Sequence, residues 1–500
     1  MRKFFWWLGA ALLALLLAVG VRTLTMSSRQ LTVPPVAPLA VDGAAAAARL
    51  AGAVRLQTIS SPTDPTLNAA AFDALHRHLE TSFPNAHAVL QREAVGHALV
   101  YTWPGSVAGA KPIALMAHQD VVPIAPGTER DWKEPPFAGV VKDGFIWGRG
   151  AWDDKGNLMA IMEAVDALAR AGFKPPQTIY LVFGADEEVG GARGARAIAQ
   201  MFKQRGVRFQ LVLDEGLLIT QGVLPGLKGP AAIVGVAEKG MLTLQLTATT
   251  APGHSSMPPP GAGQSAIGML AAALTRIENQ PMPLAIRGLS RETFETLAPE
   301  MGGLSRVFLS NLWLFRPLVE MQLAKAASTN ASLRTTTALT VFNAGNVENV
   351  LPGKATALVN FRVLPGDRID DIVAHVTRAI DNPAIRVERY NVAAEASKVS
   401  PTDGPAWRLV NTTLRQLHPD VVVAPALMVA ATDSRWFDDI ADAVFRFSPV
   451  RATPEDLKRF HGTDERISVA NYVELIQFFH QLITNTRDGA ARTAQPGDTP

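Results

Sequence analysis

Two adjacent aspartates, Asp153 and Asp154, are the strongest chemical signal in this sequence. They lie in a glycine-rich stretch, Trp147-Gly-Arg-Gly-Ala-Trp-Asp-Asp-Lys-Gly-Asn157, which leads into an apolar, helix-like run over residues 158–169. Neighbouring carboxylates repel each other, so such a pair favours a bound cation or a network of donors that compensates the charge. Gly and Asp are also ordinary turn residues, and this stretch alone leaves a solvated surface turn equally open.

Three further segments carry acids or His directly after strand-like apolar runs. Because ligands of open α/β sheets bind at the carboxyl ends of the strands, we expect these side chains to meet at one edge of a sheet. The sequence contains no cysteine, so a metal held there would use His and carboxylate ligands. The segments are Ala117-His-Gln-Asp120 after residues 112–116, Asp186-Glu-Glu-Val-Gly190 after residues 178–183, and Asp214-Glu215 after residues 210–213.

Together these motifs resemble the co-catalytic zinc exopeptidases and amidohydrolases, a family that includes carboxypeptidase S, glutamate carboxypeptidase, aminoacylase and carnosinase. The likeness is greatest to the branch of carboxypeptidase S and the N-fatty-acyl-amino-acid hydrolases, and it spans residues 45–483 in the family's motif order. It implies two Zn²⁺ ions per subunit and a small peptide or N-acyl amino acid as substrate. The motifs that carry it are Trp147–Gly156, Leu213-Asp-Glu-Gly216, Gly253-His-Ser-Ser-Met-Pro258 and His461-Gly-Thr-Asp-Glu465.

The resemblance also implies the metal ligands. Asp153 would bridge the two ions, with a cis peptide bond to Asp154. Glu215 is easily confused with Asp214, and the family pattern favours Asp214. From the residues alone, His118 could equally be a ligand or an ordinary histidine. The implied ligands are His118 and Asp214 for one ion, Glu188 and His461 for the other, and Asp153 for both.

Five further residues receive roles from the resemblance. Glu187 would be the general base, and Asp120 would orient the imidazole of the nearby ligand. His254, on an inserted domain, would donate to the oxyanion of the tetrahedral intermediate. Arg362 would clamp the substrate carboxylate through its planar guanidinium, and Asn349 matches a substrate-binding motif.

The alternation of strand-like and helical runs predicts an α/β fold with a mostly parallel sheet. After residue 240 the pattern changes to the strand-helix-strand-strand-helix-strand order of a ferredoxin-like α+β domain, which the family uses as a lid or dimerisation domain. Residues 284–333 are more than this topology needs and indicate an elaborated substrate or partner surface. We expect residues 44–239 and 393–485 to form the catalytic domain, residues 240–392 the inserted domain, and residues 486–500 a disordered tail.

The N-terminus indicates a location outside the cytoplasm. Arg2 and Lys3 precede a charge-free run over residues 4–21, long enough to approach the threshold for spanning a bilayer. Residues 1–26 are interpreted as a membrane anchor in preference to a cleaved signal peptide, because the cleavage pattern near Ala18-Val-Gly20 is weak. Residues 27–43 contain Pro34, Pro35 and Pro38 and predict an extended linker that holds the enzyme off the membrane.

The expected function is a membrane-anchored metallohydrolase that cleaves an amide bond next to a free carboxylate. A carboxypeptidase S-like peptidase is favoured over an N-acyl-amino-acid hydrolase, although the shared motifs do not separate them. A homodimer through the inserted domain is compatible with the family. A catalytically inactive binding protein would require the loss of a ligand or of the base, and none is lost. The balance of 47 Lys and Arg against 45 Asp and Glu offers no basic field for nucleic acid.

Overall fold

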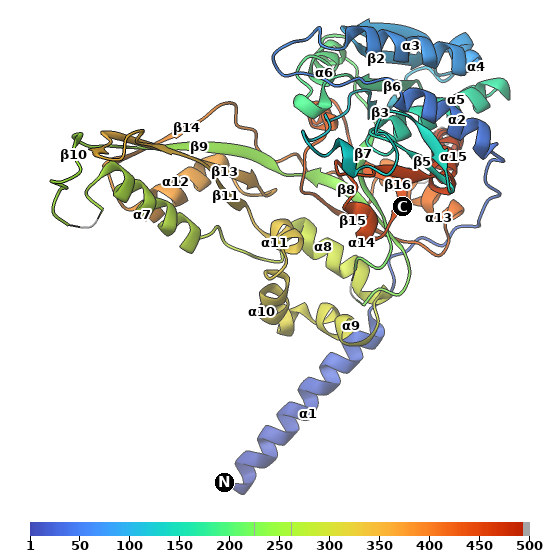
Figure 1. The fold of residues 1–500 in the computed structure, drawn as a ribbon. Helices are drawn as coiled ribbons and strands as arrows, with labels where there is room; N and C mark the ends of the chain where they lie inside the picture. Colours follow the sequence, from blue (N-terminus) through green and yellow to red (C-terminus); the bar gives the residue numbers. More distant parts are fainter. Residues whose placement is uncertain (225, 262, 494–500) are drawn as a thin grey trace.

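The computed structural model describes residues 1–224, 226–261 and 263–493. Figure 1 shows a layered body, an arm that extends from one side of it, and a stem formed by the N-terminal helix α1 (Arg2–Thr25). The short helices of residues 288–333 lie where the body, the arm and the stem meet (Figure 1).

The body is organised around an eight-stranded sheet with the order β1-β2-β6-β3-β7-β16-β8-β15. Strands β6, β3, β7 and β16 are mutually parallel, as are β8 and β15, whereas β1–β2, β2–β6 and β16–β8 are antiparallel pairs. The predicted α/β class with a mostly parallel sheet is therefore confirmed. The strands are β1 (Gln91–Val95), β2 (Ala98–Trp103), β3 (Ile113–His118), β6 (Ile179–Gly184), β7 (Leu211–Thr220), β8 (Ala231–Glu238), β15 (Val422–Met428) and β16 (Val444–Ala452).

Helices cover both faces of this sheet, which explains why its central strands are apolar along their whole length. All six residues of β3 are buried. Most of the helices pack with one face of the sheet in the largest hydrophobic core, and α6 (Ala195–Gln204) packs in the core on the other face. The helices of the larger core are α2 (Gly43–Val54), α3 (Ala69–Ser82), α4 (Pro84–Val89), α5 (Lys155–Arg170), α13 (Pro405–Leu417) and α15 (Val469–Thr493). A small sheet of β4 (Val140–Lys142), β5 (Phe145–Trp147) and β17 (Arg466–Ser468) and the short helix α14 (Pro454–Leu457) complete the body.

The arm contains the predicted ferredoxin-like arrangement. Its sheet has the order β11-β13-β9-β14, all pairs are antiparallel, and two helices supply its core. A two-stranded pair, β10 (Gly253–His254) with β12 (Val350–Leu351), lies at the far end of the arm (Figure 1). The elements are β9 (Gly240–Thr249), α7 (Ala266–Asn279), β11 (Thr336–Ala344), β13 (Lys354–Val363), α12 (Ile369–Ile380) and β14 (Ile385–Arg389).

Lys239 alone separates β8 of the body from β9 of the arm. Its ammonium is buried and donates to the backbone carbonyls of Ala331 at 2.8 Å and Arg334 at 2.9 Å. Burial, followed by the nearby Arg362 guanidinium, lowers the pKa of Lys239 to about 8. The junction between body and arm is therefore a buried, hydrogen-bonded position.

The segment 284–333 forms four helices: α8 (Gly288–Leu297), α9 (Gly303–Ser310), α10 (Leu312–Leu323) and α11 (Ala327–Leu333). Figure 1 shows α9 against the upper end of α1. The helices therefore adjoin the N-terminal stem as well as the body, which the sequence did not predict.

Three segments differ from expectation. Strand β7 continues past Asp214 to Thr220, so Asp214 lies within the strand rather than beyond its end. The segment 27–43 is extended but bound to the body, since the Gln30 amide pairs with the backbone of Val423 in both directions, at 2.7 and 3.0 Å. Helix α15 runs to Thr493 through part of the expected disordered tail, of which residues 494–500 lie outside the described residues.

Candidate metal and catalytic site

The two carboxylate oxygens of Asp153 face two different histidines. Oδ1 lies 3.0 Å from His118 Nε2, and Oδ2 lies 2.6 Å from His461 Nε2. Asp153 lies in the loop between β5 and α5, His118 ends β3, and His461 follows α14, so three distant segments converge on one buried carboxylate. The peptide bond between Asp153 and Asp154 is cis, as the resemblance implied. The positions of the two histidines, one at each carboxylate oxygen of Asp153, suit a carboxylate that bridges two cations.

A further carboxylate joins each histidine. Oε1 of Glu188 is 3.4 Å from His461 Nε2 and is buried without a hydrogen-bond partner. Glu215 completes the other group, in which ligand atoms of His118, Asp153 and Glu215 all lie within 4.8 Å of one another. Zinc accepts nitrogen and oxygen ligands of this kind, and the orphaned Glu188 oxygen fits a cation as its missing partner.

Asp214, the predicted ligand, has other partners in the structure. Its Oδ2 accepts from the Ser434 backbone N–H at 2.8 Å, and its Oδ1 accepts from the Glu215 N–H at 3.0 Å. Strand β7 is irregular here, since Asp214 pairs with Arg446 and Leu217 with Phe447, and Glu215 is the residue of this pair that groups with His118 and Asp153. Glu215 is therefore a second candidate for the ion at His118, and the assignment of Asp214 stays a prediction.

The cluster holds more buried carboxyl groups than its two imidazoles can neutralise. Burial raises the pKa of Glu187 to about 8 and raises that of Glu215 well above its usual value, and neighbouring carboxylates add to both shifts. Burial lowers the pKa of the His118 imidazole, but hydrogen bonds with Asp120 and Asp153 outweigh this effect and raise the pKa well above its ordinary value. The excess of negative charge is what a site for positive ions requires.

Asp120 connects the imidazole of His118 to the loop that carries the predicted base. His118 Nδ1 lies 2.9 Å from the Asp120 carbonyl oxygen and 3.4 Å from its Oδ1. The Asp120 carboxylate also accepts from the backbone N–H groups of Glu187 and Glu188, both at 3.1 Å, and from the Ser60 hydroxyl at 2.6 Å. Asp120 therefore positions both the ring of His118, chiefly through its backbone carbonyl, and the loop of Glu187, through its carboxylate.

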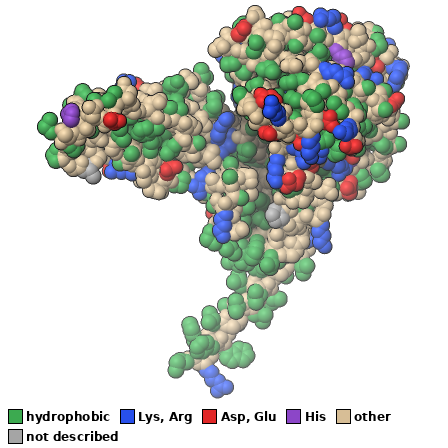
Figure 2. Space-filling model, in the orientation of Figure 1, with side chains coloured by type: hydrophobic (Ala, Val, Ile, Leu, Met, Phe, Trp, Pro, Cys, Tyr) green, Lys and Arg blue, Asp and Glu red, His purple; other side chains and the backbone are tan. Residues whose placement is uncertain are grey.

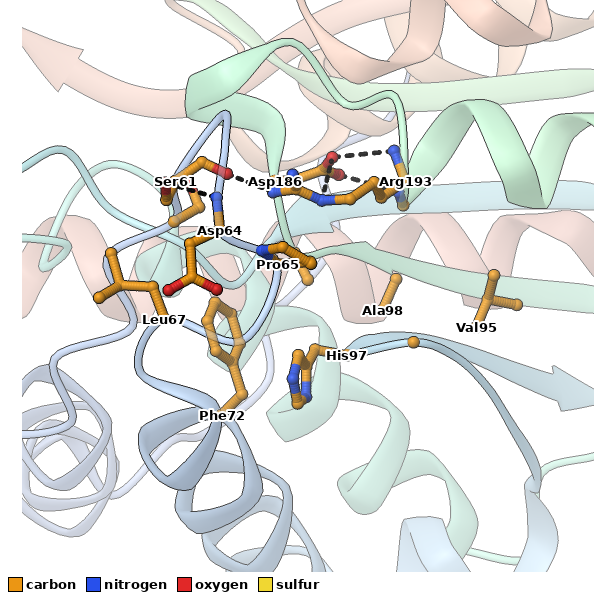
Figure 3. Close-up of a pocket in the computed structure, with 14 residues that line it drawn as sticks. Ser61, Asp64, Pro65, Leu67, Phe72, Val95, His97, Ala98, Asp186 and Arg193 are labelled. Carbon is orange, nitrogen blue, oxygen red and sulfur yellow. Dashed lines mark hydrogen bonds and ion pairs between the residues drawn. The ribbon is translucent and has the colours of Figure 1, made fainter.

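The outer side of the same loop is held by Asp186, whose carboxylate accepts from the backbone N–H groups of Arg193 at 2.9 Å and Gly194 at 2.8 Å. Asp186, Arg193 and Gly194 line a cavity of about 90 Å³. The Arg193 side chain extends toward Ser61 and donates to its carbonyl at 2.6 Å (Figure 3). The cavity does not include the metal-binding candidates. We assign it to the support of the loop.

Glu465 fixes the loop that carries Asp153. Its Oε1 accepts from the backbone N–H groups of Gly150 at 2.9 Å, and of Trp152 and Asp153 at 3.1 Å each. Its Oε2 pairs with the Arg149 guanidinium, which donates in turn to the backbone carbonyl oxygens of His461 and Gly462. Both side chains are buried. This ion pair connects the loop that carries Asp153 to the loop that carries the candidate ligand His461.

The residues predicted on the inserted domain lie away from the cluster. His254 and Asn349 are close together at the far end of the arm, where the Ser255 N–H donates to the Asn349 carbonyl at 3.0 Å. Arg362 lies near the other end of β13, opposite Met241. The structure does not bring these three predicted residues to the metal-binding candidates, whereas it does bring together those of the body.

The sequence analysis missed the partners that position the cluster. Arg149 and Glu465 are both inside quoted motifs, so a search for opposite charges within paired motifs would have found them. Asp186 begins one of the acidic segments but received no role, and Ser60 lies in a segment with no distinctive spacing. Only the fold reveals their contacts.

Imidazoles and carboxylates grouped around one shared aspartate, at the carboxyl edge of an α/β sheet with a ferredoxin-like insertion, define a metal-dependent hydrolase. Comparison with known proteins agrees. The model of peptidase family M20/M25/M40 matches residues 114–485, and the chain belongs to this family.

Similar proteins carry two kinds of name. The chain is 40% identical to a probable carboxypeptidase S-like 2 of Dictyostelium discoideum over 95% of this chain and 92% of that protein. It is also 40% identical to an N-fatty-acyl-amino acid synthase/hydrolase of Danio rerio, over 87% and 84%. Among solved structures, an M20 family metallo-carboxypeptidase from Sulfolobus solfataricus is similar, with a TM-score of 0.62 at 16% identity over 89% of this chain and 99% of that one. Human carnosine dipeptidase 1 has a TM-score of 0.59 at 15% identity over 90% and 100%.

Proposed function

We propose that this protein is a two-zinc hydrolase that cleaves the amide bond next to a free carboxylate, as a carboxypeptidase S-like peptidase. The observation that carries the proposal is the Asp153 carboxylate, which faces His118 with one oxygen and His461 with the other. The alternative substrate is an N-acyl amino acid, because a relative with that activity in its name is as similar as the carboxypeptidase S-like one.

The candidate metal ligands form two groups that share Asp153. His118, Asp153 and Glu215 would hold one Zn²⁺, and Asp153, Glu188 and His461 the other. When bound, the ions supply Lewis acidity and an acidified water. Asp214 stays the other candidate for the first ion because of its place in the family motif.

Glu187 would act as the general base. It is half-buried, it adjoins the metal-binding candidate Glu188, and its backbone N–H donates to the Asp120 carboxylate. A carboxylate in this position can accept a proton from the attacking water and pass it to the leaving nitrogen. Asp120 would serve as the positioning residue for this transfer.

The arm would supply the remaining groups. His254 would donate to the oxyanion, and Arg362 would grip the substrate carboxylate, with Asn349 beside His254. His254 lies at the far end of the arm, so the arm must close on its own body or the residue must serve a second copy in a homodimer. Either route would bring His254 from the far end of the arm to a metal-binding cluster.

The stem would place this chemistry at a membrane. Helix α1 is long and apolar enough to span a bilayer, and Arg2 and Lys3 at its start favour a cytoplasmic N-terminus. The body would then lie on the periplasmic or extracellular side. A signal sequence that is cleaved is the alternative.

The test compares free-acid and amide forms of one dipeptide, and of one N-acyl amino acid, on the wild type and on Arg362→Ala. The zinc hydrolase should release the C-terminal residue from the free acid, and Arg362→Ala should lower kcat/KM sharply for the acid while the poor amide changes little. Equal losses on acid and amide would refute the carboxylate-gripping role. Absence of amide cleavage in the zinc-loaded wild type on all these substrates would refute the function itself.

A further inference from the structure

The upper end of helix α1 is held by specific polar contacts with the segment of α8–α11. The Asn311 side chain, which is fully buried, donates to the Thr23 hydroxyl at 2.9 Å and to the Val19 carbonyl at 3.3 Å. Arg22 donates from Nε to the Ser310 carbonyl at 2.8 Å, and Arg306 donates to the Thr23 carbonyl at 3.2 Å. The Asn311 amide also donates to the Val307 carbonyl at 2.9 Å, so it connects the stem to the end of α9.

These contacts lie at the depth where a bilayer would end. A membrane-spanning helix needs about 20 apolar residues for a hydrocarbon core about 30 Å thick. Counted from Phe4, directly after the basic residues, the charge-free run ends at residue 21, so Arg22 and Thr23, which contact Ser310 and Asn311, lie at its outer boundary. The helices α9 and α10 therefore meet the stem at the outer surface of the membrane.

The same helices expose a group of large apolar side chains. Leu304 on α9 is 71% exposed, and on α10 the exposed fractions are 55% for Trp313, 45% for Leu318 and 57% for Met321. Leu318 and Met321 are one helical turn apart. The Trp313 indole N–H donates to the side-chain oxygen Oδ1 of Asn311 at 3.1 Å. An aromatic ring with one bonded polar end is typical of a membrane interface.

The apolar surface is continuous with the stem. Figure 2 shows the hydrophobic side chains of α1 and further hydrophobic side chains on the part of the body directly above it. Exposed patches of this kind mark a binding partner, and the adjoining helix α1, which is long and apolar enough to cross a membrane, favours lipid over protein as that partner.

We propose that α8–α11 form a membrane-seated collar, which grips the uncleaved helix α1 through Asn311 and inserts the exposed apolar residues of α9 and α10 into the outer leaflet. The body then lies on the lipid surface. This corrects the expectation of a linker that holds the enzyme off the membrane, because residues 27–43 are bound to the body and the stem docks directly.

The absence of native cysteine allows a direct test on the full-length protein in phosphatidylcholine nanodiscs. Nitroxide labels on Leu304→Cys, Leu318→Cys and Met321→Cys should collide more with oxygen and less with a water-soluble nickel complex than a label on Met257→Cys. Met257 is 77% exposed on the arm and serves as the matched control. Labels that match the control at all three sites would overturn the lipid-facing surface.

The grip on the stem is tested by disulfide formation. The pair Thr23→Cys/Asn311→Cys should lose both free thiols on mild oxidation, whereas Thr25→Cys/Asn311→Cys should keep them, because Thr25 is exposed on another face of α1. Thiols that persist in the first pair would overturn the docking. A mature protein that lacks residues 1–26, measured by mass, would overturn the retained anchor.

Discussion

Replacing Glu465 by Gln tests whether the Arg149–Glu465 ion pair shapes the metal-binding cluster. Glutamine keeps an oxygen for the three backbone N–H groups of the Asp153 loop, but it removes the charge opposite the buried Arg149 guanidinium. Removing one partner of a buried pair costs about 3–5 kcal/mol, because the other charge is left uncompensated. We expect a loss of this size in the stability of the body.

The reverse change, Arg149→Met, should cost a similar amount, since it leaves Glu465 charged and buried. The double variant carries no unpaired charge, so its cost should fall below the sum of the single costs by about 1–3 kcal/mol. Denaturant unfolding of the zinc-free proteins followed by tryptophan fluorescence measures these differences. Trp132 is a suitable reporter because the Arg149 guanidinium lies over its ring, 5.4 Å from the centroid.

The pair should also influence metal binding, because Arg149 holds the His461 carbonyl at 3.0 Å. Arg149→Met should therefore weaken zinc affinity by about 10- to 100-fold, the usual effect of losing a group that orients a ligand. Competition with a chelator measures the affinity. Additive single costs together with unchanged zinc affinity would refute the proposed link between the two loops.

Three further predictions concern the ligands, the arm and the junction. Glu215→Gln should lose one zinc by metal analysis and Asp214→Asn should keep both; the opposite result would restore the family-based choice. Mixing the inactive variants His254→Ala and Glu187→Gln, each zinc-loaded, should recover activity if His254 serves a second copy, and closure onto its own body predicts none. The native state releases the Lys239 proton at about pH 8, while the unfolded chain keeps it to about pH 10.5, so the unfolded state binds more protons in this window and stability rises with pH. The Tm of the wild type minus that of Lys239→Met should accordingly increase between pH 8 and 10.5, and a flat or falling difference would contradict the burial of a charged Lys239.

The sequence predicted the fold well where hydrophobic period and motif order were strong. The buried run of β3 and the alternating pattern of β9 and β13 gave the correct element types. It failed where tertiary contacts decide the outcome. The segment 27–43 has no periodicity because it binds the body through scattered contacts such as that of Gln30. The helices of residues 284–333 contact helix α1, and no local sequence pattern indicates that contact.

For the site, the sequence identified residue types and neighbourhoods better than orientations. His118, Asp153, Glu188 and His461 come together as expected. The choice between Asp214 and its neighbour depends on which way β7 presents its alternate side chains, and motif spacing carries no information on that direction. The placement of His254 depends on the angle between two domains, which no local pattern encodes.

Strand β9 leaves the body at Lys239 and extends toward the end of the arm where His254 lies (Figure 1). At about 3.3 Å per residue its ten residues reach about 33 Å, so a rotation of about 20° at the junction displaces the far end by roughly 12 Å. Removing two residues from β9 and two from the paired β13 would shorten this radius by about 7 Å without changing any chemical group. The length of one strand therefore sets the distance that His254 can cover, independently of its chemistry.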